Sequence, residues 1–181
     1  MTPRPIHVAF DETGNQKYPR VYVLVSTTNP YNVVEKYYRR RLHPKRFKES
    51  RLKDFLSQEG NDWRCCMIPR SSFKHRFNNV FPTLLREISK EYGGDLRFRL
   101  DIDGDKSGIM GFPIESVDDV DEVRFYPKIK SEPYLYHNLL RVADSLANLL
   151  GRIPNFFWGK DIDLPDFYRE IGLERRFVPL N

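Results

Sequence analysis

Hydrophobic and polar positions alternate along several short stretches of this chain and recur every three or four residues along others. Alternation is typical of strands with one buried face, and the wider spacing is typical of amphipathic helices. The alternating stretches predict strands at residues 6–11, 20–27, 63–68, 96–102 and 122–127. The wider spacing and the start and stop signals predict helices at residues 32–42, 49–57, 71–92 and 133–150. We expect the tail to form a short helix and an extended end.

The order of these elements predicts an α/β fold. Two paired strands come first, a third follows, and the later strands alternate with helices, which favours a mixed sheet over a doubly wound Rossmann sheet. The sequence has no Gly-rich phosphate loop of the Walker or dinucleotide type, so a nucleotide cofactor has no support. A chain of 181 residues suits one domain. We therefore expect a single domain over residues 1–181, with 155–181 as a C-terminal extension packed on it.

Composition and cysteine content indicate where such a protein works. No apolar run approaches the ~20 residues of a membrane-spanning helix, and the first residues lead into a strand rather than a signal peptide. The only cysteines, Cys65 and Cys66, are neighbours and therefore poorly placed to link distant segments, which fits a reducing compartment. We expect a cytoplasmic protein without membrane contact, whose oligomeric state the sequence leaves open.

Positive charge gathers in one stretch, where Glu49 is the only acidic residue between Lys36 and Lys53. The formal net charge is +5, and aromatic rings interleave with the cations. Rings can stack on bases while cations follow the backbone of a nucleic acid. A solvated helix face with inward-facing rings is the alternative. The residues predicted to contact RNA or DNA are Lys36, Arg39, Arg40, Arg41, Lys45, Arg46, Lys48, Arg51 and Lys53.

Carboxylates stand at the ends of two similar segments. The segment 6–15 has Asp11 at its sixth place, and the segment 96–105 repeats the pattern with Asp101 at the same place. Period-two alternation puts Asp103 on the same strand face as Asp101. Two strands that end alike could lie side by side and bring their carboxylates together.

The helix predicted at 133–150 supplies a further carboxylate, because Asp144 stands at the edge of its apolar stripe. If this helix packs over the strand ends, the grouped carboxylates need cations to remain ionised. Such oxygen ligands suit Mg²⁺ or Mn²⁺, and two ions about 4 Å apart would support phosphodiester hydrolysis. The predicted catalytic residues are Asp11, Glu49, Asp101 and Asp144. The predicted metal ligands are Asp11, Asp101, Asp103 and Asp144, with the choice between Asp101 and Asp103 open.

Each acid also has an ordinary interpretation as a turn former, a helix cap or an ion-pair partner for the 30 Lys and Arg residues. Other hydrolytic chemistry has less support, because the histidines, serines and cysteines lack the spacing of a catalytic triad or nucleophile elbow. An EF-hand after Asp101 is excluded because its twelfth place holds Phe112 instead of a glutamate.

Two short motifs resemble a known family. The segment Phe10-Asp11-Glu12-Thr13-Gly14 resembles the Asp-Glu-Ser-Gly start of the domain of unknown function 3800 group, whose members are regarded as RNase H-like. Residues 141–147, Arg-Val-Ala-Asp-Ser-Leu-Ala, resemble that group's late Leu-Gln-Leu-Ala-Asp-Leu-Ile-Ala helix. A looser third match is a middle Glu followed by Lys, as in Glu49 and Lys53. The chain departs from the pattern at Thr13 and at 141–142.

The resemblance implies an RNase H-like α/β fold, with a mixed five-stranded sheet and helices on both faces. It makes Asp11 the first-strand metal ligand, Asp101 the central-strand ligand and Asp144 the last-helix ligand, with Glu49 as the accessory acid. The expected function is a divalent-metal-dependent nuclease, with RNA or DNA as substrate. The alternatives are an inactive nucleic-acid-binding or protein-interaction module on the same fold, and a structural protein of a virus or mobile element.

Overall fold

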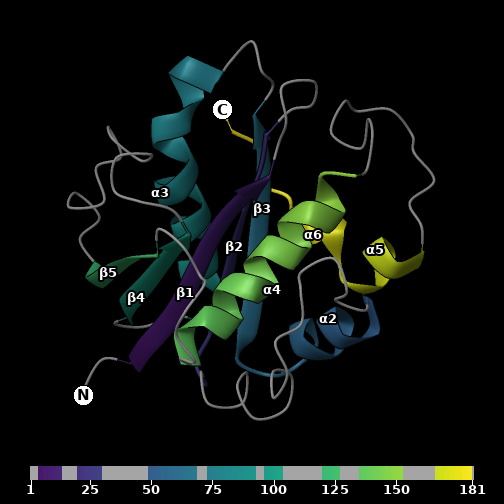
Figure 1. Ribbon diagram of the computed structural model, residues 1–181, viewed down its shortest axis with the longest axis horizontal. Coiled ribbons are helices and arrows are strands. Elements are labelled where there is room, and N and C mark those ends of the chain that lie inside the picture. The colour runs from purple at the N-terminus through teal and green to yellow at the C-terminus, as the bar shows by residue number, and fades with distance from the viewer. Residues whose placement is uncertain are drawn as a thin grey trace.

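The computed structural model describes residues 4–13, 20–29, 49–68, 73–92, 96–103, 120–126, 135–152 and 166–180. In this part of the chain, five strands form one sheet with helices on both faces (Figure 1). The strands are β1 (Arg4–Thr13), β2 (Arg20–Thr27), β3 (Asn61–Ile68), β4 (Leu96–Asp103) and β5 (Val120–Tyr126). The helices are α2 (Glu49–Leu56), α3 (Phe73–Tyr92), α4 (Leu135–Leu150), α5 (Asp166–Glu170) and α6 (Leu173–Arg176).

Strand β1 lies at the centre of the sheet, whose order is β3-β2-β1-β4-β5. It pairs antiparallel with β2 and parallel with β4. The pair β2 and β3 is antiparallel, and the pair β4 and β5 is parallel. A parallel pair needs a long crossover connection, and α2, β3 and α3 all lie between β1 and β4 in the chain. The predicted mixed α/β sheet is confirmed.

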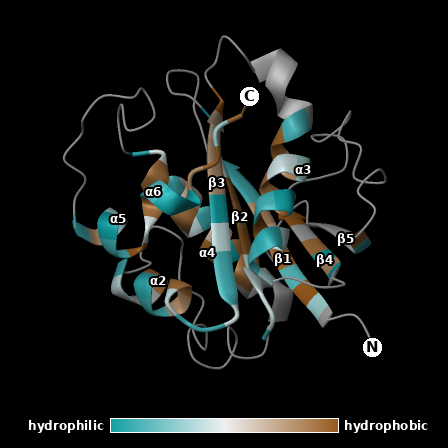
Figure 2. Cartoon of the chain, turned by 180° about the vertical axis from the view of Figure 1, so that it is seen from behind, coloured by the Kyte–Doolittle hydropathy of each residue, from teal (hydrophilic) through white to brown (hydrophobic). Residues whose placement is uncertain are grey.

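Strand alternation divides the core between the two sheet faces, and bands of hydrophobic and hydrophilic residues are visible along the strands in Figure 2. On one face, Ile6, Val8 and Phe10 of β1 pack in a cluster with apolar residues of β4 and α3. On the other face, Ala9 packs in a cluster with residues of β2, β3 and α4. Helix α4 thus covers the face to which the odd-numbered positions of β1 belong.

The predicted elements correspond closely to the observed ones. The bounds of β2 are as predicted, and α2 and α4 each differ from prediction by two residues or fewer at either end. After α6, Phe177 forms a bridge with Cys65 of the edge strand β3, and the N–H of Val178 donates to the Cys65 carbonyl oxygen at 2.8 Å. The predicted helix at 32–42 lies outside the described residues, and the division into a domain and a C-terminal extension stays a prediction.

None of the described helices is long and apolar enough to cross a membrane.

The two cysteines are buried on opposite faces of β3. Burial raises the pKa of both thiols, and for Cys65 the neighbouring Cys66 adds to the effect. Because the thiolate is the nucleophile, we expect neither thiol to react with iodoacetamide at about pH 8 in the folded protein. In urea we expect both thiols to react, and mass spectrometry measures the labelling. Rapid labelling of the folded protein would contradict this expectation.

These raised thiol pKa values also make the stability of the folded protein depend on pH. A thiol of the unfolded chain ionises at about pH 8.5, whereas the folded thiols stay protonated well above that pH. The unfolded state therefore loses protons first as the pH rises. Stabilisation by the protonated buried thiols is complete below the unfolded pKa and declines above it.

Candidate carboxylate site

Asp11 lies near the end of β1 and is 8% exposed. Its Oδ1 accepts a hydrogen bond from the Glu12 N–H at 2.8 Å, which holds the carboxylate against the strand. Alternation along β1 places Asp11 on the same face as Ala9, under α4. An aspartate is costly to bury without partners, so its place under the helix requires polar or cationic neighbours.

Glu12 belongs to the opposite sheet face and has a different environment. Its carboxylate accepts hydrogen bonds from the Arg20 guanidinium at 3.1 and 3.4 Å, and both side chains are more than 40% exposed. Strand pairing places Glu12 beside Tyr22. Burial, and then the Glu12 charge, raises the pKa of Tyr22, so this phenol stays protonated. The two acids of the Asp-Glu-Thr-Gly motif are therefore not equivalent.

The pairing of β1 with β4 brings the second predicted carboxylate segment beside Asp11. Asp101 pairs with Ala9, and Ile102 pairs with Phe10. Continuing this register by one residue places Asp103 beside Asp11. Asp11 and Asp101 hold the same place in their two similar segments, but the strand register pairs Asp11 with position 103, two residues further along β4. The backbones of Asp101 and Asp103 are described, while their side chains lie outside the described part of the structure.

Asp144 lies in the second half of α4, which packs over β1 and β2. Its neighbours Ala143 and Ala147 are buried against the sheet, and their small side chains allow the helix to approach β1. Asp144 itself is half-buried. The Nδ2 of Asn148 donates to the Asp144 Oδ1 at 2.7 Å and to its carbonyl oxygen at 2.9 Å. Asn148 thus fixes the orientation of the carboxylate.

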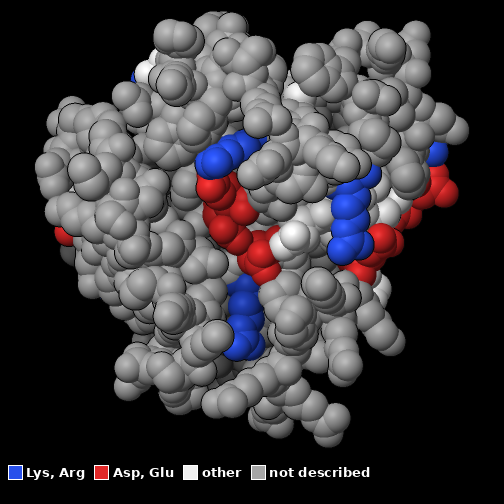
Figure 3. All heavy atoms as spheres, turned by 45° about the horizontal axis from the view of Figure 1, so that its top comes forward, with Lys and Arg blue, Asp and Glu red and all other residues white. Residues whose placement is uncertain are grey.

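The apolar cover that α4 provides ends at β1. The cluster beneath α4 contains no described residue of β4, whereas β4 supplies three residues to the cluster on the α3 side. On the α4 face of β4, Arg97 is half-exposed and Arg99 is exposed. Figure 3 views the end of the molecule where β1 and α4 end, and there acidic side chains gather with basic ones on either side.

Glu49 is the first residue of α2, which packs against β3 and α5 rather than against β1 or β4. It is exposed, and its charge contributes to the raised pKa of Tyr168, after burial as the first cause. Within the described residues, no hydrogen bond or ion pair joins Glu49 to Asp11 or Asp144, so its role as the accessory acid stays a prediction.

Most of the predicted nucleic-acid stretch, from Lys36 to Lys48, lies outside the described residues. The Arg51 backbone belongs to α2, and its side chain is not described. The Lys53 ammonium donates to the Glu170 carboxylate at 2.6 Å, so this cation already has an acidic partner. The role of the stretch in binding nucleic acid stays a prediction.

Carboxylate oxygens are the donors that Mg²⁺ and Mn²⁺ prefer, and in this respect the residues at the site fit such ions. Of the predicted metal ligands, Asp11 and Asp144 have described side chains. No three His, Cys, Asp or Glu side chains of the described set form a metal-binding group. The contribution of Asp101 or Asp103 from β4 to such a site stays a prediction.

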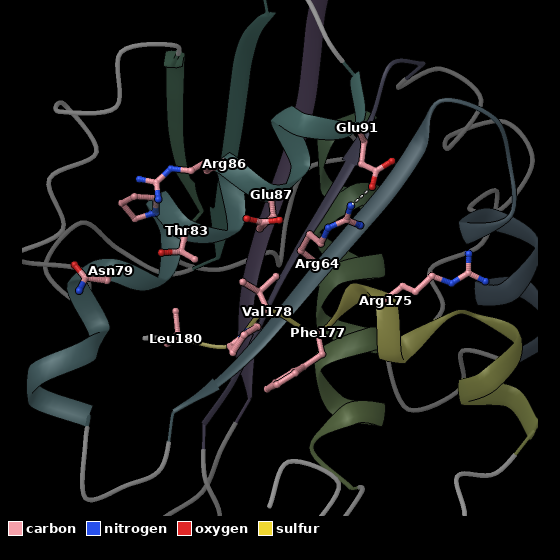
Figure 4. A pocket seen from close by; sticks show the side chains of 12 residues that line it. Arg64, Asn79, Thr83, Arg86, Glu87, Glu91, Arg175, Phe177, Val178 and Leu180 are labelled. Atoms are coloured by element: carbon pink, nitrogen blue, oxygen red, sulfur yellow. Dashed lines mark hydrogen bonds and ion pairs between the residues drawn. The ribbon is translucent and has the colours of Figure 1, made fainter. Parts of the chain in front are cut away.

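A separate cavity of about 630 Å³ lies between α3 and the segment that follows α6 (Figure 4). Arg64 of β3 lines it and donates to Glu91 of α3 at 2.5 Å. In Figure 4, Arg86 and Arg175 stand at opposite sides and point away from each other. Arg86 and Arg175 do not converge on one ligand, so the described residues that line this cavity form no built anion site.

The chain has an RNase H-like fold: a mixed sheet with helices on both faces and a buried aspartate on the central strand. Bst-RNase HIII in complex with Mn²⁺ is similar to this chain, with a TM-score of 0.50 and 12% identity over 82% of the chain. A mutant protein of Bst-RNase HIII gives a TM-score of 0.46 and 13% identity over the same share. The chain spans about half the length of these solved chains, 52% in each case.

At such identities the likeness concerns the fold, and the predicted RNase H-like fold is confirmed. No family model matches the chain. No curated protein matches it either. Membership of the domain of unknown function 3800 group therefore stays a prediction.

Sequence reasoning did not predict the hydrogen bond that Asn148 donates to the Asp144 carboxylate. The signal was present, since residues four apart on a helix are neighbours and Asn148 follows Asp144 at that spacing.

Proposed function

We propose that this protein is a divalent-metal-dependent nuclease that hydrolyses phosphodiester bonds of nucleic acids. One observation carries the proposal: the parallel pairing of β1 with β4 beneath α4. This arrangement assigns Asp11 and the positions 101 and 103 to the sheet face on which α4 carries Asp144. In the proposed site, three elements distant in sequence would thus supply carboxylates to one end of the sheet.

Asp11, Asp144 and an aspartate of β4 would hold Mg²⁺ or Mn²⁺. Bound ions would supply activation of water and stabilisation of the leaving oxygen. The protein's own groups keep the ligands in place: the Glu12 N–H holds Asp11, and the Asn148 amide holds Asp144. The register, which brings position 103 beside Asp11, favours Asp103 as the shared ligand of β4, with Asp101 as the alternative.

Further support comes from the fold, because a similar solved structure is Bst-RNase HIII in complex with Mn²⁺. The two motifs that resemble those of the domain of unknown function 3800 group support the same site residues. Glu49 is proposed as an accessory acid, and the stretch from Lys36 to Lys53 as a surface that holds RNA or DNA. A cytoplasmic location agrees with this function.

The first experiment measures cleavage by the unmodified protein. We expect hydrolysis of labelled single-stranded RNA, duplex DNA or an RNA–DNA hybrid in Mn²⁺ or Mg²⁺, and none in EDTA, because the carboxylates cannot activate water without a bound cation. Gel electrophoresis of the products measures the result. Salt-sensitive binding of all three substrates, without cleavage in either metal, would instead support an inactive nucleic-acid-binding module.

A further inference from the structure

Most described cations have acidic partners. The ion pairs among described residues are Arg20 with Glu12, Lys53 with Glu170, Arg64 with Asp62 and Glu91, Lys90 with Glu87, Arg97 with Asp121, Arg169 with Asp166, and Arg176 with Asp62. Among the described residues, four arginines form no ion pair with another described side chain: Arg86, Arg141, Arg152 and Arg175. Two of these four lie on or directly after α4.

Arg141 and Arg152 share one side of α4 with Asp144 and Asn148, at spacings of three, four and four residues. We name these four residues the α4 ridge. The helical turn continues to its end, because the N–H of Gly151 donates to Ala147 at 2.9 Å and that of Arg152 to Leu149 at 3.1 Å. The ridge is about 16 Å long at the rise of an α-helix.

The α4 ridge is accessible, and Asp144 lies where the ridge borders the buried face of the helix. Arg141 and Asp144 are half-buried, whereas Asn148 and Arg152 are exposed. The buried residues of the helix, such as Leu139, Ala143 and Leu150, face the sheet. A guanidinium without an acidic partner among the described residues therefore lies at each end of the ridge, on the same surface as the Asp144 carboxylate.

Guanidinium groups bind phosphate oxygens through paired hydrogen bonds, and their charge draws a polyanion to the surface. Arg152 also lies at the helix C-terminus, where a cation is favoured by the helix dipole, but that effect does not account for Arg141. Arginines on both sides of a carboxylate would attract phosphates that lie some steps apart along a strand, one on each side of the carboxylate.

We propose that the α4 ridge binds the sugar–phosphate backbone of the nucleic acid, with Arg141 and Arg152 contacting phosphates on either side of Asp144. This inference rests on the proposed nuclease function and adds the direction of the bound strand, which runs along α4. The ridge spans about five base steps of a duplex at 3.4 Å each.

The experiment compares two double variants that lose the same charge, Arg141→Ala/Arg152→Ala on the ridge and Arg86→Ala/Arg175→Ala at the cavity. Binding of a fluorescein-labelled DNA duplex is followed by anisotropy in EDTA over a series of salt concentrations. We expect the ridge variant to bind at least about tenfold more weakly. Its slope of log K against log salt should be shallower by about 1.8, for two lost phosphate contacts. The cavity variant should match the unmodified protein.

Thermal unfolding of both variants should match that of the unmodified protein, because neither pair of arginines belongs to an ion pair with a described residue. Equal affinity and slope for the ridge variant and the unmodified protein would overturn the inference, even if the unmodified protein cleaves nucleic acid in Mn²⁺. Equal losses in the two variants would also overturn it, because net charge would then explain binding. Ridge-dependent binding without cleavage in either metal would support the ridge and overturn the nuclease proposal.

Discussion

Replacing Asp11 with asparagine is expected to lower metal-dependent cleavage about a thousandfold or more while the protein remains folded. A metal ion supplies several kcal/mol of transition-state stabilisation, and each ~1.4 kcal/mol corresponds to a tenfold change in rate. Asparagine has the size of aspartate and can still accept the Glu12 N–H bond through its amide oxygen. Single-turnover cleavage in Mn²⁺ measures the loss, and circular dichroism measures the fold.

Glu12→Gln is the matched control, since Glu12 is the next residue and carries the same charge. It belongs to the other sheet face and forms an exposed ion pair with Arg20, which contributes roughly 0–1 kcal/mol to stability. We expect its cleavage rate to stay within about threefold of the unmodified protein, on the order of 0.6 kcal/mol. Equal losses in the two variants would contradict the assignment of Asp11 as the β1 ligand.

The largest effect on stability is expected from Asp62→Ala. Asp62 is 4% exposed, and its Oδ1 accepts a bond from Arg64 at 2.9 Å and also contacts the Arg176 guanidinium. Arg64 is 5% exposed and would lose its most buried partner. Removing one member of a buried ion pair costs about 3–5 kcal/mol, so the free energy of unfolding should fall by about 3 kcal/mol or more in urea denaturation.

Lys53→Ala provides the comparison, because it breaks an ion pair of similar length at the surface. Both Lys53 and Glu170 are nearly half-exposed, so the expected loss is about 1 kcal/mol or less. The double variant Asp62→Leu/Arg64→Met should recover part of the loss, because it removes both buried charges. If Asp62→Ala costs no more than Lys53→Ala, the buried ion pair does not stabilise the fold as argued.

The sequence predicted the elements of this fold because alternation and helical spacing report burial directly. The bounds of β2 followed from a run of β-branched and aromatic residues, and the edge position of Asp144 followed from the apolar stripe of α4. Both features are local. The confirmed fold class followed from the order of the elements and from two short motifs.

The register of β1 and β4 could not be predicted in the same way. The similar segments suggested that Asp11 and Asp101 are equivalent, yet Asp101 pairs with Ala9. A shift of two residues keeps every side chain on its own face, so alternation cannot detect it. The register depends on how the two strands pack against α3 and α4 in three dimensions. That Arg141 and Arg152 form no ion pair with a described residue likewise depends on residues distant in sequence.

The bridge between Phe177 and Cys65 also bears on the behaviour of this protein at high concentration. An uncovered outer strand offers its N–H and C=O groups to strands of other molecules, which is a common route to aggregation. The segment after α6 donates a hydrogen bond to the Cys65 carbonyl oxygen near the middle of β3. It divides the accessible edge into two short runs, and each offers a foreign strand less length to pair with. The segment after α6 thus shields part of the β3 edge from pairing with strands of other molecules.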